Sequence, residues 1–377
     1  MPAYLDHAAT GPMRPEAIEA MLPFFGDRYA NPSGAHRRAR DARRAIDEAR
    51  DDLAAVLGCA PGEIVFTSGG TESDNLAVFG LGIGDGAVVC SAIEHHAVLD
   101  PVLSLGGRVV AVDHRGHVDP RALVTALEAG PVRMVSLMAV NNETGVIQRL
   151  DDLAAIVRRH APDAALHSDA VQAFCWTDVA TTCAVVDSFS LSAHKFGGPK
   201  GVGALVVRDG VALSARQLGG GQERERRSGT QNVAGIVAMA VAARLAAEER
   251  AAEIARLGAL RDRLLDGLLA SIDGLVETGG SDRSDRAAGI AHVCIPGVES
   301  EALLYLLERE DVSASAASSC ASGAVQSSHV LEAMGVDPTL SKGSLRLSLG
   351  HATSASDIDD ALVVIPAAVE RLRSFGI

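Results

Sequence analysis

Three lysines, in a chain that otherwise uses arginine, are the first residues that could carry chemistry. Lysine and arginine together number 34, and the lysines are Lys195, Lys200 and Lys342. Arginine keeps its proton in a protein, whereas lysine can lose it, and a Schiff base requires a neutral amine. Lys195 ends a strand-like run in SLSAHKFGGPKG, where a parallel sheet would place a ligand. Surface lysines beside a glycine-rich turn would give the same pattern, so this segment alone leaves both interpretations open.

The segment EIVFTSGGTESDNLAVFG could bind an anion. Its apolar start predicts a strand that enters a Gly-Gly turn, and a helix is expected from about Thr71. The free N–H groups and the dipole at such a helix start favour a negatively charged ligand, and the Thr71 hydroxyl can add a hydrogen bond. A capped helix after a strand is also common without any ligand.

Asp169 and His95 could act on a flat, protonated ring. Asp169, in HSDAVQA, is expected at a strand end 26 residues before Lys195. A carboxylate there can pair with a protonated ring nitrogen and keep the ring electron-accepting. His95, in AIEHHAVLD, can stack on such a ring and move protons near neutral pH. A helix cap for Asp169 and a structural role for His95 are the alternatives.

Cys320 differs from the other cysteines in its surroundings. It lies in SASAASSCASGAVQSS, which consists almost entirely of small residues and predicts an exposed loop. An accessible thiolate is a nucleophile, whereas a buried thiol is inert, although an incidental loop cysteine fits the same pattern. No C-x-x-C pair or zinc spacing occurs, so we expect no metal site, and free thiols favour a reducing cytoplasm. The other cysteines are Cys59, Cys90, Cys175, Cys183 and Cys294.

The elements that must position these residues follow an α/β pattern. From about residue 60 to 210, short apolar runs alternate with helical stretches, which predicts a mainly parallel sheet. A long helical stretch follows from Asn232 to about Ile272, and a second α/β region reaches Ile377. We therefore expect a large domain over residues 15–250. A smaller α/β domain, made of residues 1–14 and 251–377, would carry Cys320.

Composition narrows the class of protein. With 377 residues and 47% hydrophobic residues, the chain can bury the cores of two domains. The formal net charge of -14 argues against general nucleic-acid binding, which needs basic patches. No apolar run reaches the length of a membrane span, and the N-terminus has no secretory pattern. We expect a cytoplasmic protein with no direct nucleic-acid or membrane partner.

In their order along the chain, these segments resemble the cysteine desulfurases. That family lies within the class V aminotransferase group of fold-type I enzymes, which use pyridoxal 5′-phosphate (PLP). The resemblance covers nearly the whole chain and is closest to the NifS/IscS-like long-loop subgroup. The matching segments are YLDHAAT, NPSGAH, FTSGGTESDN, EHHAVL, VNNETGV, SDAVQ, SAHKFGGPKGVGAL, RRSGTQNV, SSCASGA, SHVLEAMG and SLRLSLGHATS.

The resemblance assigns roles to individual residues. Lys195 would hold PLP as a Schiff base and act as acid and base at the substrate Cα, while Cys320 would be the nucleophile. Arg346 would clamp the substrate carboxylate, with Asn31 close by. Thr230 would reach the phosphate of a neighbouring subunit, which implies a homodimer. The ring contacts would come from His95, Asn142, Asp169 and Gln172, and those to the phosphate from Gly70, Thr71, Ser192 and His194. Among these, His95 would also handle the substrate thiol proton, and Asn142 would lie near the substrate.

The implied reaction takes sulfur from L-cysteine, leaves it as a persulfide on Cys320 and releases L-alanine. The sulfur would pass to an iron–sulfur scaffold, a tRNA-thiolating enzyme or a sulfur carrier. A selenocysteine lyase or a direct cysteine lyase of the same fold is the nearest alternative, and a direct eliminating lyase would not require Cys320. A non-catalytic scaffold for sulfur trafficking is the alternative of another class. The chain departs from the family pattern at Ala317, Gly198 and Ser327.

Overall fold

The computed structural model describes residues 2–81, 84–316 and 328–374, and its main element is a seven-stranded sheet. The strand order is β2-β8-β7-β6-β5-β3-β4. Strand β8 pairs antiparallel with β2 and β7, and every other neighbouring pair is parallel, so the predicted mainly parallel sheet is confirmed. Its strands are β2 (Ile64–Thr67), β3 (Ala87–Ser91), β4 (Arg108–Val110), β5 (Val132–Ser136), β6 (Ala165–Asp169), β7 (Ser188–Ser192) and β8 (Gly203–Val207).

Helices cover both faces of this sheet, so that residues on both sides of its strands are buried. One face packs against α3 (Gly70–Leu81) and α4 (His96–Ser104) through a core cluster that includes Val65, Leu76 and Val98. The opposite face packs into a larger core. The helices of that second layer are α2 (Arg37–Leu57), α5 (Pro120–Glu128), α6 (Leu150–His160) and α7 (Val179–Thr182), and α1 (Pro15–Met21) lies beside them. The 3-10 helices are η1 (Leu22–Phe25), η2 (Pro61–Glu63), η3 (Ala193–Lys195) and η4 (Gln222–Glu225).

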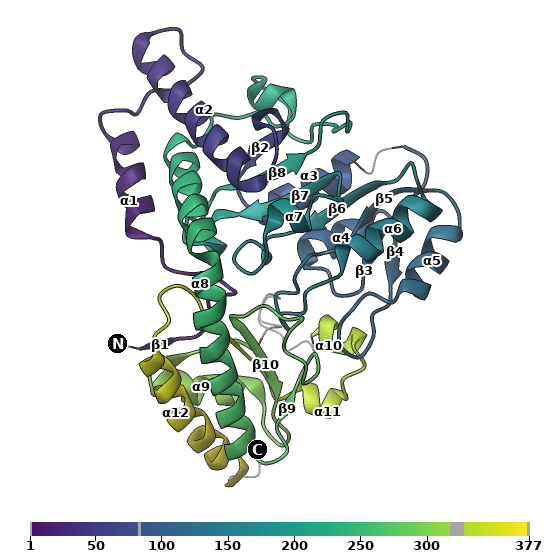
Figure 1. Ribbon diagram of the computed structural model, residues 1–377, viewed down its shortest axis with the longest axis vertical. Coiled ribbons are helices and arrows are strands. Elements are labelled where there is room, and N and C mark those ends of the chain that lie inside the picture. Colours follow the sequence, from purple (N-terminus) through teal and green to yellow (C-terminus); the bar gives the residue numbers. More distant parts are fainter. Residues whose placement is uncertain (1, 82–83, 317–327, 375–377) are drawn as a thin grey trace.

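A second core lies below the large sheet (Figure 1). Its centre is a three-stranded sheet in the order β12-β10-β9, beside a parallel pair formed by β1 and β11. The N-terminal segment and the C-terminal part of the chain share this core, because Asp6 forms a parallel bridge with Ser348 at the end of β12. The elements are β1 (Ala3–Tyr4), β9 (Val276–Glu277), β10 (Ile290–Cys294), β11 (Val312–Ser313), β12 (Ser344–Ser348), α9 (Ser300–Arg309), α10 (His329–Ala333), α11 (Pro338–Ser341) and α12 (Ala355–Ser374).

One helix, α8 (Val233–Ser271), crosses both cores without a break (Figure 1). Its first buried stretch, 234–246, belongs to the large-sheet core, and its second, 257–268, belongs to the smaller core. The domain boundary that the sequence predicts near residue 250 lies between these two stretches. We therefore still propose a large domain of residues 15–250 and a smaller domain made of residues 1–14 and 251–377. None of the described helices is long and apolar enough to cross a lipid bilayer.

Candidate active site

A cavity of about 590 Å³ lies where the carboxyl ends of the large-sheet strands face the smaller core. That is the expected place for a ligand in an open α/β sheet, and the volume suits a cofactor with a small substrate. Ten of the residues expected at the site line it. They are Gly70, Thr71, His95, Asn142, Asp169, Gln172, Ser192, His194, Lys195 and Arg346.

The start of α3 forms one end of the cavity. The helix begins at Gly70, one residue before the expected Thr71, and both residues line the cavity. A Cβ on Gly70 would lie 2.7 Å from Val171 Cγ2, so a larger residue there would require the Val171 side chain to move. The first N–H groups of a helix lack intrahelical partners, and Ser192 and His194 add polar side chains beside them. This end of the cavity can therefore hold a phosphate group.

Asp169 ends β6 inside the cavity with 5% of its surface exposed. Its Oδ1 accepts a hydrogen bond from the Val171 N–H at 2.9 Å. Burial raises the pKa of Asp169 to about 6, and the nearby Asp74 carboxyl adds to this, while His95 and the Val171 N–H act in the opposite direction. A buried carboxyl with a raised pKa is stabilised by a cationic partner, which a protonated pyridine nitrogen would supply.

Asp74 is a second buried carboxyl of the cavity, and the sequence interpretation missed it. It lies on α3 with 1% of its surface exposed, and its Oδ1 is hydrogen-bonded to His167 Nε2 at 3.2 Å. Burial raises the pKa of Asp74 to about 7 and lowers the pKa of His167 to about 4. Asp74 lies in the segment TESDN, which we had already expected at the site. This position was the sequence signal that could have identified Asp74 as a site residue.

His95 is the N-cap of α4, and this fixes its ring. Its Nδ1 accepts a hydrogen bond from the Ala97 N–H at 3.1 Å. In the neutral ring the proton must then lie on Nε2, which leaves an N–H donor for the cavity. Burial is the main cause that lowers the pKa of His95, and this favours the neutral ring. His95 therefore caps a helix and also lines the cavity. For Asp169 we had considered a helix cap as the alternative to a functional role, but at His95 the two roles occur together.

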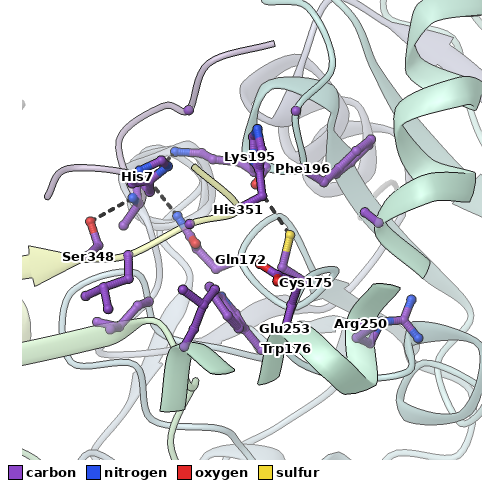
Figure 2. Close-up of a pocket in the computed structure, with 18 of the residues that line it drawn as sticks. His7, Gln172, Cys175, Trp176, Lys195, Phe196, Arg250, Glu253, Ser348 and His351 are labelled. Carbon is purple, nitrogen blue, oxygen red and sulfur yellow. Dashed lines mark hydrogen bonds between the residues drawn. The ribbon is translucent and has the colours of Figure 1, made fainter. Parts of the chain in front are cut away.

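Lys195 follows β7 in the short helix η3, and its Nζ reaches the N-terminal segment. It donates hydrogen bonds to the backbone oxygens of Ala8, at 2.5 Å, and Ala9, at 2.9 Å. Gln172 Nε2 donates to the same Ala8 oxygen at 2.7 Å, and the Ala8 N–H donates to Ser348 Oγ at 2.8 Å. A second cavity of about 50 Å³ shares Ala8, Gln172 and Lys195 with the first (Figure 2). The segment YLDHAAT is therefore a wall of the site, held by residues from both cores.

The other two lysines do not line this cavity, and both are exposed. Lys200 lies two residues after Gly198, which is one of the positions where the chain departs from the family pattern. A Cβ on Gly198 would lie 2.8 Å from Ala193 Cβ, so this backbone has no room for the larger residue that the family often has there.

Arg346 brings a buried cation to the cavity from β12. Its Nη2 donates to Asp6 Oδ1 at 2.9 Å, and its Nη1 donates to the backbone oxygen of Asn142 at 3.0 Å. Each of these nitrogens carries a second N–H, so the guanidinium can still bind a carboxylate. Arg346 Nε and Asn142 Oδ1 are both buried, without a hydrogen-bond partner among the described residues. Asp6 and Ser315 also line the cavity and were missed, although Asp6 lies in the segment YLDHAAT.

Two of the expected site residues are not brought to this cavity within one chain. Asn31 and Thr230 are exposed and do not line it. The expectation that Asn31 lies close to Arg346 is therefore not met within one chain, and Thr230 was expected at another subunit. Cys320, like Ala317 and Ser327, lies outside the described residues. Among the described residues, no group of three or more His, Cys, Asp or Glu side chains could hold a metal ion.

The residues of the cavity fit PLP. The start of α3 suits its phosphate, the buried Asp169 suits its ring nitrogen, and the Lys195 amine suits its aldehyde. The chain belongs to the aminotransferase class-V family, whose model matches residues 3–361, and this family is PLP-dependent.

Known proteins of this family are similar to the chain over its full length. It is 45% identical to an IscS-like cysteine desulfurase of Mycobacterium tuberculosis, covering 98% of this chain and 97% of that protein. A solved structure described as a NifS-like protein superposes with a TM-score of 0.89 at 34% identity and covers 100% of both chains. Another, described as SspA in complex with cysteine, has a TM-score of 0.77 at 31% identity, covering 92% of this chain and 98% of that chain.

Proposed function

We propose that this protein is a cysteine desulfurase that moves sulfur from L-cysteine to Cys320 and releases L-alanine. The observation that carries the proposal is the meeting of Lys195, Asp169 and Arg346 in one cavity between the two cores. An amine, a ring-pairing carboxylate and a carboxylate-binding guanidinium are the groups that an amino acid and PLP require together. The cysteine desulfurase named above and the cysteine complex of SspA support cysteine as the substrate.

The residues of the chain have separate tasks in this reaction. Arg346 binds the substrate carboxylate, and Asn142 lies beside it. Lys195 takes the proton from the substrate Cα and returns a proton to the product. When bound, PLP supplies an electron sink that stabilises negative charge at Cα, and Asp169 keeps the ring nitrogen protonated. His95 presents its Nε2 proton to the reacting groups.

Cys320 attacks the substrate sulfur as a thiolate. The bond between that sulfur and the substrate carbon breaks, a bond to Cys320 Sγ forms, and the carbon takes up a proton to complete alanine. Burial raises the thiol pKa of every described cysteine, to about 11 for Cys175 and Cys59, and Cys90, Cys183 and Cys294 shift in the same direction. A raised pKa depletes the thiolate at neutral pH, so these cysteines are poor nucleophiles, which supports Cys320 in this role.

The wider context belongs to the same proposal. The enzyme acts as a homodimer in the cytoplasm, with Thr230 completing the phosphate site of the partner subunit and Asn31 close to the substrate carboxylate. The persulfide sulfur passes to an acceptor protein, which is an iron–sulfur scaffold, a tRNA-thiolating enzyme or a sulfur carrier. No nucleic acid is bound directly, since the net charge is -14.

Replacing Cys320 tests this function against a direct cysteine or selenocysteine lyase. The Cys320→Ser enzyme should bind PLP and show cysteine-induced absorbance changes, but it should form almost no alanine. Mass spectrometry of the parent enzyme after incubation with cysteine should place the extra sulfur on Cys320. Cys59→Ser, which removes a half-buried thiol, serves as the control and should keep parent activity. Alanine and sulfide release at the parent rate by Cys320→Ser would replace our proposal with a direct lyase.

A further inference from the structure

The turn at residues 141–145 is held rigidly at the edge of the active site. Asn141 Oδ1 accepts hydrogen bonds from the N–H groups of Glu143, at 3.0 Å, and Thr144, at 2.9 Å. Asn141 Nδ2 donates to the backbone oxygen of Ile93 at 3.1 Å, which ties the turn to the segment before His95. Gly145 has a φ of +76°, and a Cβ there would lie 2.9 Å from Ile290 Cβ. These contacts leave the turn little freedom to move.

This turn joins two groups that are distant in sequence. On one side, the backbone oxygen of Asn142 accepts the hydrogen bond from Arg346 Nη1. On the other side, Glu143 Oε2 accepts a hydrogen bond from Ser328 Oγ. Glu143 is 4% exposed and Ser328 is 5% exposed, so water competes little for this bond. Burial raises the pKa of Glu143, and the Ser328 hydroxyl opposes that shift.

Ser328 also begins a helix that is docked on the large sheet. It is the N-cap of α10, and its Oγ accepts a hydrogen bond from the Leu331 N–H at 3.2 Å. His329 Nε2 is hydrogen-bonded to the backbone oxygen of Glu94 at 2.9 Å. An apolar cluster holds the rest of the helix against the segments beside Glu94 and Asn141. Its buried members are Ile93, Met138, Val330 and Met334.

We infer that Glu143 is a positioning residue for sulfur transfer, because it fixes Ser328 to the turn that also holds Arg346. Cys320 precedes Ser328 by eight residues in the sequence, a separation of at most roughly 29 Å along an extended chain. The bond therefore fixes Ser328, at which the described chain resumes after Cys320, relative to the guanidinium that would bind the substrate. The inference rests on the proposed function, because it concerns the step in which Cys320 accepts sulfur.

Glu143→Ala and Glu143→Gln separate this role from a general loss of stability. Glutamine keeps an acceptor oxygen for Ser328, whereas alanine removes it. We expect alanine formation to fall about 10- to 100-fold in Glu143→Ala, the range typical of a small misplacement of reacting groups, and to stay within threefold of the parent in Glu143→Gln. PLP content and the cysteine-induced absorbance change should remain, because the groups that contact PLP and substrate are intact.

Hydrogen exchange supplies a readout that does not depend on turnover. In Glu143→Ala, the peptide covering residues 328–336 should exchange faster, while Glu143→Gln should match the parent. Asp119→Ala, which removes the N-cap of α5, is the matched control and should leave both exchange at 328–336 and alanine formation unchanged. If Glu143→Ala does not fold, the double change Glu143→Met with Ser328→Ala removes both side chains of the bond together, and Ser328→Ala alone is its control because both variants lose the cap on the Leu331 N–H.

The outcomes distinguish this inference from the function on which it rests. Parent-rate alanine formation and unchanged exchange in Glu143→Ala would overturn the inference, provided that Cys320→Ser is inactive. A loss in Ser328→Ala with no loss in Glu143→Ala would also overturn it, since Ser328 would then act only as a helix cap. An equal loss in Glu143→Gln would overturn the inference too, since the charge of Glu143 would then matter rather than its bond to Ser328. An active Cys320→Ser would instead overturn the proposed function.

Discussion

Asp6 and Arg346 form an ion pair of 2.9 Å across 340 residues of sequence, and both side chains line the active-site cavity. In the proposed function, the substrate carboxylate therefore shares this guanidinium with a carboxylate of the protein. Asp6 orients Arg346, and it also reduces the positive charge that the substrate meets.

Changing Asp6 should separate these two effects. In Asp6→Asn, an amide oxygen still accepts from Arg346 but the competing charge is gone, so we expect a KM for cysteine about fivefold lower. In Asp6→Ala, the lost charge-assisted bond, which is worth about 1.5–3 kcal/mol, should leave Arg346 less ordered and raise KM about tenfold. Steady-state alanine formation measures both. Asp360→Asn on the surface is the control, and a higher KM in Asp6→Asn would contradict the competing role of Asp6.

Lys195 should be the residue that carries PLP. Borohydride reduction of the yellow enzyme followed by peptide mapping should find the pyridoxyl group on Lys195, because it is the lysine that lines the cavity. Lys195→Ala should lose the visible absorbance of the Schiff base. Label on Lys200 or Lys342 would show that the assignment is wrong.

Thr230 should act across a subunit interface, since it is exposed and does not line the cavity of its own chain. We expect a dimer in sedimentation experiments. Thr230→Ala should weaken PLP retention by about 1.5–3 kcal/mol, the value of one hydrogen bond to a charged group. Dialysis against a PLP trap measures this, with the exposed Thr125→Ala as the control. A fully active monomer would exclude this role.

Glu94 should make the PLP-free protein less stable as the pH rises. Burial raises its pKa to about 8 from an ordinary value near 4.5, although Ser91 Oγ and the Met138 N–H both donate to its Oε1. The unfolded chain then loses its proton at lower pH than the native protein, so stability from this group is present below pH 4.5 and is lost progressively up to pH 8.

Glu94→Gln keeps both acceptor bonds and cannot ionise. We expect it to remove on the order of several kcal/mol of pH dependence in the free energy of unfolding, since one pKa unit corresponds to about 1.4 kcal/mol. Urea unfolding at pH 5, 6, 7 and 8 measures the slope. Equal slopes for the variant and the parent would show that Glu94 is not the titrating group.

The sequence predicts the elements of this protein better than their pairing. Each apolar run between residues 60 and 210 forms a strand, and the helix expected from Asn232 to Ile272 spans Val233–Ser271. Periodicity is a local property, so it identifies these elements directly. The antiparallel insertion of β8 between β2 and β7 depends on long-range pairing, which periodicity does not contain.

The site residues, too, could be predicted from the sequence where the signal is local and not where it depends on long-range packing. Lys195, Asp169 and His95 could be found because each stands at an element end with suitable chemistry. Asp6 was missed because its partner Arg346 is 340 positions away. Asp74 was missed because its depth depends on how α3 packs on the sheet.

Because the continuous helix α8 packs in both cores, the number of residues in it sets how the two cores are rotated relative to each other about the helix axis. It has 39 residues, or about 58 Å of length, and each core holds one end of it. One alanine inserted in its exposed middle, near residue 250, would turn the core that carries Arg346 by about 100° relative to the core that carries Lys195. Seven inserted residues would nearly restore the angle but separate the two side chains by about 10 Å along the axis. The number of residues in α8 therefore determines, together with the side chains themselves, whether Lys195 and Arg346 face the same cavity.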